Sequence, residues 1–210
     1  MASTMKQIAK QCFPLATQVS DRFHVQKLAS EAVQEVRIKY RWEAIDAENE
    51  AITKAKNNGK VYNEKLLSYG DTLKQLLARS RYLLFKSPDK WTTNQKVRSE
   101  LLFETYPKIK QAYDLSNQLR SIYNSSIEKN VAITKLAQWY NKVESSDFKS
   151  FKTIMNTISI NYDTILNYFD SRSTNAAAES FNAKIKAFRS RFRGVRNVDF
   201  FLFRLTNIYA

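Results

Sequence analysis

The sequence predicts a mainly α-helical fold. Gly and Pro together account for only 6 of 210 residues, whereas average usage would give roughly 25. A β-sandwich or barrel needs many tight turns, so this scarcity favours long helices. Hydrophobic residues make up 43% of the chain and aromatic residues 13%. That content is enough to build a packed core and argues against wholesale disorder.

The N-terminal half is predicted to contain three helices and one short strand. From Val25 onward, apolar residues recur at i, i+3, i+4, i+7, i+8 and i+11, the spacing of one helix face. The Asn57-Asn58-Gly59 sequence is a good stop signal for this helix. In order, the predicted elements are a helix over 3–13 closed by Pro14, a strand over 16–20, a helix over about 25–56 and a helix over about 62–86.

The next part of the chain is predicted to be helical throughout. Thr92 and Gln95 are spaced as a capping box, which predicts a helix from there to about residue 104. Pro107 suits the first turn of the following helix. Further helices fit residues 130–143 and 147–168, and the segment 165–169 could instead form a strand.

The last predicted helices begin at Ala176 and near Asn197. Asn175 or Thr174 can cap the first of them, and Gly194 can end it. At 100° per residue, an apolar stripe and a polar stripe lie roughly 200° apart on this helix. The apolar stripe is Phe181, Ile185, Phe188 and Phe192, and the polar stripe is Glu179, Asn182, Lys186, Arg189 and Arg193.

The polar stripe has two interpretations. A single carboxylate leading a row of cations suits a site that binds a metal and a nucleic-acid backbone together. Alternatively, Glu179 complements the helix dipole and the cations are simply solvated. Asp21 is similarly open: it follows the predicted strand, where a metal ligand is common, but it could equally cap the next helix.

Charge and composition restrict the partners. The formal net charge is +14, and the last 40 residues carry +6 of it. A polyanionic partner is expected, with nucleic acid ahead of a membrane surface. One Cys and one His, His24, exclude a disulfide framework and a multi-His zinc site. No long apolar run or signal-peptide core is present, so we expect a cytoplasmic protein, associated with the nucleoid if it binds DNA, and no membrane partner.

Two blocks of the sequence carry distinctive motifs. The first is Asp21-Arg22-Phe23-His24 with the residues that follow it, including Arg37 and Tyr40-Arg41-Trp42. The second is 173–186, with an N-x-x-x-E-x-x-N-x-K-I-K pattern, followed by Gly194-Val195-Arg196-Asn197. Together these blocks resemble a group of bacterial insertion-sequence transposases of the DDE class. They stand in that family's order and flank the helical middle, so the likeness spans nearly the whole chain.

The resemblance implies an RNase H-like α/β core interrupted by a large helical insertion. It divides the chain into a core remnant (1–24), the insertion (25–168) and C-terminal core helices (169–210). Three acidic residues would hold two Mg²⁺ or Mn²⁺ ions for DNA cleavage and strand transfer, because hard cations prefer carboxylate oxygens. By motif position, Asp21 and Glu179 are the second and third acids. The implied DNA contacts are Asn182, Lys184, Lys186, Arg189, Arg193 and Arg196, with Arg22, His24 and Asn175 in support.

The resemblance leaves one acid without a counterpart. Residues 1–20 contain no Asp or Glu and no room for the strands that precede the first helix of such a core. We therefore expect the C-terminal part of a transposase whose first strands are missing, inactive alone and homo-oligomeric when complete. The alternatives are a non-catalytic helical nucleic-acid-binding protein acting through its basic C-terminal helix, and a protein-interaction module.

Overall fold

The structure is helical in both of the units into which the chain divides. This computed structural model describes residues 3–125, 127–172, 176–191, 194 and 196–209. None of those residues lies in a β-strand, so the mainly α fold class is confirmed. We call Met1–Ser171 the N-terminal unit and Arg172–Ala210 the C-terminal unit.

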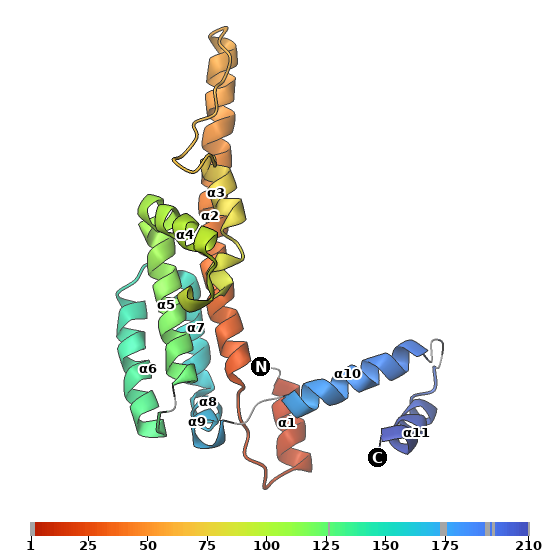
Figure 1. The fold of residues 1–210 in the computed structure, drawn as a ribbon. Helices are drawn as coiled ribbons and strands as arrows, with labels where there is room; N and C mark the ends of the chain where they lie inside the picture. Colours follow the sequence, from red (N-terminus) through yellow and green to blue (C-terminus); the bar gives the residue numbers. More distant parts are fainter. Residues whose placement is uncertain (1–2, 126, 173–175, 192–193, 195, 210) are drawn as a thin grey trace. The chain divides into compact units, whose positions relative to one another are not determined.

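The N-terminal unit is a helical bundle built around one long helix, α2 (Figure 1). Helix α2 packs against α3, α5 and α7, while α5 also packs against α4 and α6. The helices of this unit are α1 (Ser3–Cys12), α2 (Arg22–Asn57), α3 (Leu73–Arg79), α4 (Thr93–Thr105), α5 (Pro107–Asn124), α6 (Lys129–Glu144), α7 (Lys149–Ile160), α8 (Tyr162–Leu166) and α9 (Tyr168–Ser171), with 3₁₀ turns η1 (Leu83–Phe85) and η2 (Pro88–Lys90).

The bundle core is rich in large aromatic side chains. Trp139, Phe151 and Tyr168 are almost fully buried. The indole N–H of Trp139 donates to the carbonyl of Leu115 at 2.9 Å, so its one polar group is satisfied inside the core. Burying such side chains contributes about 1.5 to 3 kcal/mol each, which makes this core the main source of stability.

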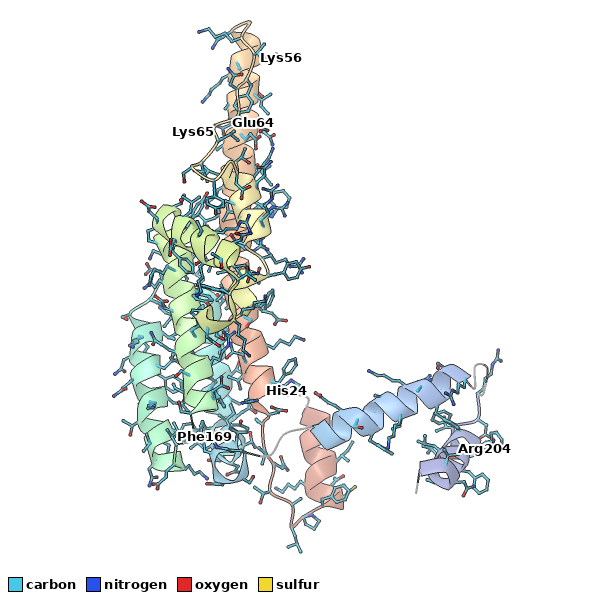
Figure 2. All side chains as sticks on the ribbon, in the orientation of Figure 1. His24, Lys56, Glu64, Lys65, Phe169 and Arg204 are labelled. Carbon is cyan, nitrogen blue, oxygen red and sulfur yellow. The ribbon has the colours of Figure 1, made fainter. Side chains whose placement is uncertain are left out.

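Only the first part of α2 belongs to this core. The buried residues of α2 run from Val25 to Arg37, and the rest of the helix extends past the other helices as an arm (Figure 1). Figure 2 shows Lys56 near the far end of this arm. At the base of the arm, the buried Arg37 donates to the carbonyl of Leu77 at 2.9 Å and to Gln34 at 2.7 Å, which ties α2 to α3.

The predicted strand over 16–20 is wrong. These residues have no regular secondary structure, and they lie against α8. The backbone N–H of Ser20 donates to the carbonyl of Thr164 at 2.7 Å, and the side-chain amide of Asn167 donates to the carbonyl of Gln18 at 3.1 Å. Thr164 in α8 and Asn167 just after it therefore satisfy backbone groups that a neighbouring strand would otherwise have paired.

Two predicted helices are shorter than the sequence indicated. In the predicted 62–86 helix, Gly70 adopts a positive φ of 76° and α3 begins only after Thr72, whose side chain caps it. The predicted 147–168 helix is divided at Asn161 and Asn167 into α7, α8 and α9, so the alternative strand at 165–169 is also wrong. The capping box of Thr92 and the Pro107 start are confirmed.

The C-terminal unit contains two helices, α10 (Ala176–Arg191) and α11 (Val198–Tyr209). They contact through Phe188 and Phe201, whose ring centroids are 5.3 Å apart. Gly194 has a φ of 95°, which suits the predicted helix stop. Asn197 caps α11, because its side-chain oxygen accepts the Phe200 backbone N–H at 2.9 Å.

Candidate functional site

Asp21 lies at the N-terminus of α2 and caps it. Its carboxylate accepts the backbone N–H of Phe23 at 2.9 Å. The sequence left open a cap or a metal ligand, and the structure shows the cap. An ionised carboxylate offers about four acceptor positions, so capping does not by itself exclude binding a cation. The metal-ligand role of Asp21 stays a prediction.

The segment before Asp21 is held in place by contacts that fix the start of α2. Ser20 is buried, and its hydroxyl lies 2.8 Å from the hydroxyl of Thr164. With the Gln18–Asn167 bond, this contact joins positions more than 140 residues apart in sequence. No local pattern at Thr164 or Asn167 signals this role, so sequence reasoning missed both residues.

Arg22 and His24 occupy the first turn of α2. The Arg22 guanidinium donates to the side-chain oxygen of Asn124, at the end of α5, at 3.0 Å. His24 is exposed, and its ring meets the exposed ring of Phe23 edge-on at 6.1 Å (Figure 2). Asn124 is a partner that the sequence analysis did not single out. The supporting roles of Arg22 and His24 stay predictions.

In the C-terminal unit, α10 carries the predicted polar stripe. Glu179 lies in its first turn, and it is exposed together with Asn182, Lys186 and Arg189. Within the described part of the chain, Glu179, Lys186 and Arg189 form none of the ion pairs found. The surface is therefore available to an anionic ligand.

The structure describes some of the remaining predicted DNA-contact residues and not others. Lys184 is exposed on α10, and Arg196 is exposed in the segment before α11. Asn175 and Arg193 lie outside the described residues, as do the alternative cap Thr174 and Phe192 of the apolar stripe. On the apolar stripe, Phe188 is buried but Phe181 is 47% exposed. The stripe therefore packs in part, against α11.

The acidic residues do not assemble a metal site on their own. Among the residues that the structure describes, no group of three or more His, Cys, Asp or Glu side chains is placed to hold an ion. Asp21 and Glu179 have the oxygen ligands that a hard divalent cation prefers. They belong to different units, and neither unit completes a ligand set. The donor chemistry fits a divalent cation, but the described ligand set is incomplete.

A model of a transposase family of the DDE class, the ISL3 type, matches residues 1–205. The chain belongs to this transposase family. The match covers both blocks on which the resemblance was based, as well as the helical bundle between them. Neither a curated protein nor a solved structure matches the chain.

Membership accounts for the general character of the chain. Transposases of insertion sequences bind the DNA ends of their element, and DDE transposases use divalent metal ions. A net charge of +14 is consistent with a DNA ligand. In the described residues, no helix of this transposase is both long and apolar enough to cross a bilayer.

Proposed function

We propose that this transposase cleaves and transfers DNA strands with metal ions bound by Asp21 and Glu179. The observation that carries the proposal is the family match over residues 1–205, which includes both carboxylates. In this role, two Mg²⁺ or Mn²⁺ ions would stabilise the attacking and leaving oxygens of the phosphodiester. Asp21 is presented at a helix end, and Glu179 is exposed in the first turn of α10.

The proposal includes the organisation implied by the resemblance. Residues 1–24 and 169–210 would belong to an RNase H-like core, and residues 25–168 would be its helical insertion. The strands of such a core are not among the residues that the structure describes. Because residues 1–20 supply no carboxylate, we expect the 210-residue chain alone to bind DNA without cleaving it. We further propose that the active form is a homo-oligomer on nucleoid DNA in the cytoplasm.

The α10 face supplies the DNA contacts in this proposal. Lys186 and Arg189 are exposed and lie on the same side as Glu179, so a DNA strand bound along this face would lead toward the carboxylate. Further positive charge would come from Lys184, Arg193 and Arg196. Asn182 would supply an amide that can form hydrogen bonds. Such contacts fix the position of the duplex without reading its sequence.

DNA binding by this face is tested with the purified chain. Replacing Lys186 and Arg189 by Gln should weaken binding to all sequences. The plot of log affinity against log salt should become flatter by about 1.8, since each phosphate contact contributes about −0.9. The control is Lys135→Gln with Lys152→Gln, which removes the same charge from a half-buried and an exposed position in the bundle. Fluorescence anisotropy over a salt series measures both. Equal effects of the two pairs would contradict the assignment of this face.

The catalytic assignment is tested in cells by excision of the element, with the substitutions made in a transposase whose upstream region supplies the first carboxylate. Glu179→Gln and Asp21→Asn should each abolish excision while the purified variants still bind DNA. Asn caps helices as well as Asp does, so Asp21→Asn removes the charge and keeps the cap. Normal excision by Glu179→Gln would exclude its metal role. It would favour the alternative of a non-catalytic nucleic-acid-binding protein.

A further inference from the structure

The N-terminal unit contains an open hollow beside the start of α2. It has a volume of about 690 Å³ and lies between α5 and the Phe85–Lys90 segment, which includes η2. The side chains around it include cations, amides and hydroxyls, together with the apolar Phe85 and Pro88. Lys86, Lys90, Arg120, Asn117, Asn124 and Ser121 are among the lining residues. A hollow with this lining suits an anionic ligand that accepts hydrogen bonds.

The cations of the hollow outnumber its carboxylate. Lys86, Lys90 and Arg120 appear in none of the ion pairs formed by the described residues. Asp89 is the one carboxylate among the lining residues, so the three cations leave a net charge of +2 there. Burial lowers the pKa of the Arg120 guanidinium, which is the cost of keeping a cation half-buried. A bound anion would offset this cost.

The walls of the hollow are held in place by hydrogen bonds. Arg120 donates to the carbonyl of Phe85 at 2.9 Å and to the side chain of Asn117 at 2.7 Å. The phenol of Tyr113 donates to the carbonyl of Lys86 at 2.7 Å. A guanidinium has five N–H groups, so these two bonds leave it donors for a ligand. The charged groups therefore need little reorganisation on binding.

The hollow is linked to the start of α2 by one contact. Asn124, which lines the hollow, accepts the hydrogen bond from Arg22. Arg22 directly follows Asp21 and is exposed. Its charge adds a fourth cation at the edge of the hollow. The cationic surface thus extends from η2 to the residue next to the proposed metal ligand.

We propose that this hollow binds backbone phosphates of DNA, as a second DNA contact separate from the α10 face. The cations and amide donors match phosphate oxygens, and the net positive charge makes the interaction salt-dependent. The proposal rests on the proposed function in that DNA is the ligand. It adds that the helical bundle itself binds a strand, next to the start of α2.

The test measures DNA affinity of the full 210-residue chain carrying Lys86→Gln and Lys90→Gln. The matched control is again Lys135→Gln with Lys152→Gln, which lie outside the hollow. At 0.1 M salt the hollow variant should lose roughly tenfold or more in affinity, and its salt slope should flatten by about 1.8. The control pair should have a smaller effect on both the DNA affinity and the salt slope. Thermal unfolding of each variant shows whether the fold is kept.

The outcomes separate this proposal from the proposed function. If the α10 variant weakens binding and the hollow variant matches its control, the hollow is not a DNA site and the proposed function stands. If the hollow variant weakens binding and the α10 variant does not, the hollow is supported and the assignment of the α10 face is wrong. A third arm titrates the chain and its variants with inorganic phosphate. If Lys86→Gln and Lys90→Gln weaken phosphate binding but leave DNA affinity unchanged, the hollow is a small-anion site and the proposal is overturned.

Discussion

The N-terminal unit buries a large set of apolar side chains in one core, whereas the C-terminal unit leaves most of its described large apolar side chains exposed. In the first, every helix from α2 to α9 contributes buried residues. In the second, Phe188 and Leu205 are the buried hydrophobic residues among those described. Six large apolar side chains there are at least 47% exposed: Phe181, Val198, Phe200, Leu202, Phe203 and Ile208.

Net charge per residue is higher in the C-terminal unit, which is the unit that buries less. The C-terminal unit carries a net charge of +6 on 39 residues, and the N-terminal unit carries +8 on 171. Helices of 12 and 16 residues with little burial gain little free energy of their own. Stability therefore resides in the bundle, while the most basic part of the chain lies on helices that contribute little to it.

The largest expected effect compares the same substitution in the two units. Phe151 is 0% exposed in the bundle and Phe203 is 61% exposed on α11. Phe151→Ala should lower the free energy of unfolding by about 3 to 5 kcal/mol, since it leaves a cavity in the core. Phe203→Ala should change it by about 0.5 kcal/mol or less. Urea unfolding followed by circular dichroism measures both. Equal losses would show that α11 shares the stabilising core.

A smaller effect tests the same difference through pH. Burial raises the pKa of Tyr113 to about 12 and also raises the pKa of Tyr123, both in the bundle. The unfolded phenol ionises near pH 10, so the stability contributed by the neutral buried form is full below pH 10. It is lost as the pH rises toward 12. The loss from Tyr113 should be about 2 kcal/mol.

The measurement for Tyr113 is the urea midpoint at pH 8 and at pH 11.5. Tyr113→Phe removes the ionisable group, so the variant should lose less stability over this interval than the unaltered chain. The same substitution also removes the hydrogen bond to Lys86, which lowers stability equally at both pH values. If the variant loses as much stability between pH 8 and pH 11.5 as the unaltered chain, Tyr113 is not a source of that loss.

Local signals predicted helix starts better than helix lengths. Thr92 with Gln95 and Pro107 each begin a helix as expected, because caps and Pro act within one turn. The prediction of one helix over 62–86 was wrong, although Leu66 and Tyr69 fit the apolar spacing of such a helix. Both are exposed, and the backbone reverses at Gly70 before the buried Asp71. Periodicity does not show whether an apolar face has anything to pack against.

The candidate site was predictable in its residue types but not in its surroundings. Glu179 and Lys186 are exposed on one helix, as the spacing indicated. The contacts that hold Ser20 to Thr164 and Arg22 to Asn124 join residues more than 100 positions apart. Such pairs depend on how helices pack, so no local pattern reveals them. The same holds for the hollow, since Lys86 and Arg120 meet only in the folded bundle.

The smallest expected effect compares two helix caps, Asp21 on α2 and Asn197 on α11. Each accepts a backbone N–H at 2.9 Å. Asp21→Ala should lower the free energy of unfolding of the bundle by about 1 kcal/mol, and Asp21→Asn by only a few tenths. Asn197→Ala loses an equivalent bond, but on a helix that adds little to the core. It should therefore leave the main unfolding midpoint unchanged and speed amide exchange at Phe200. A midpoint lowered as much by Asn197→Ala as by Asp21→Ala would mean that the two units unfold together, and the contrast between them would not hold.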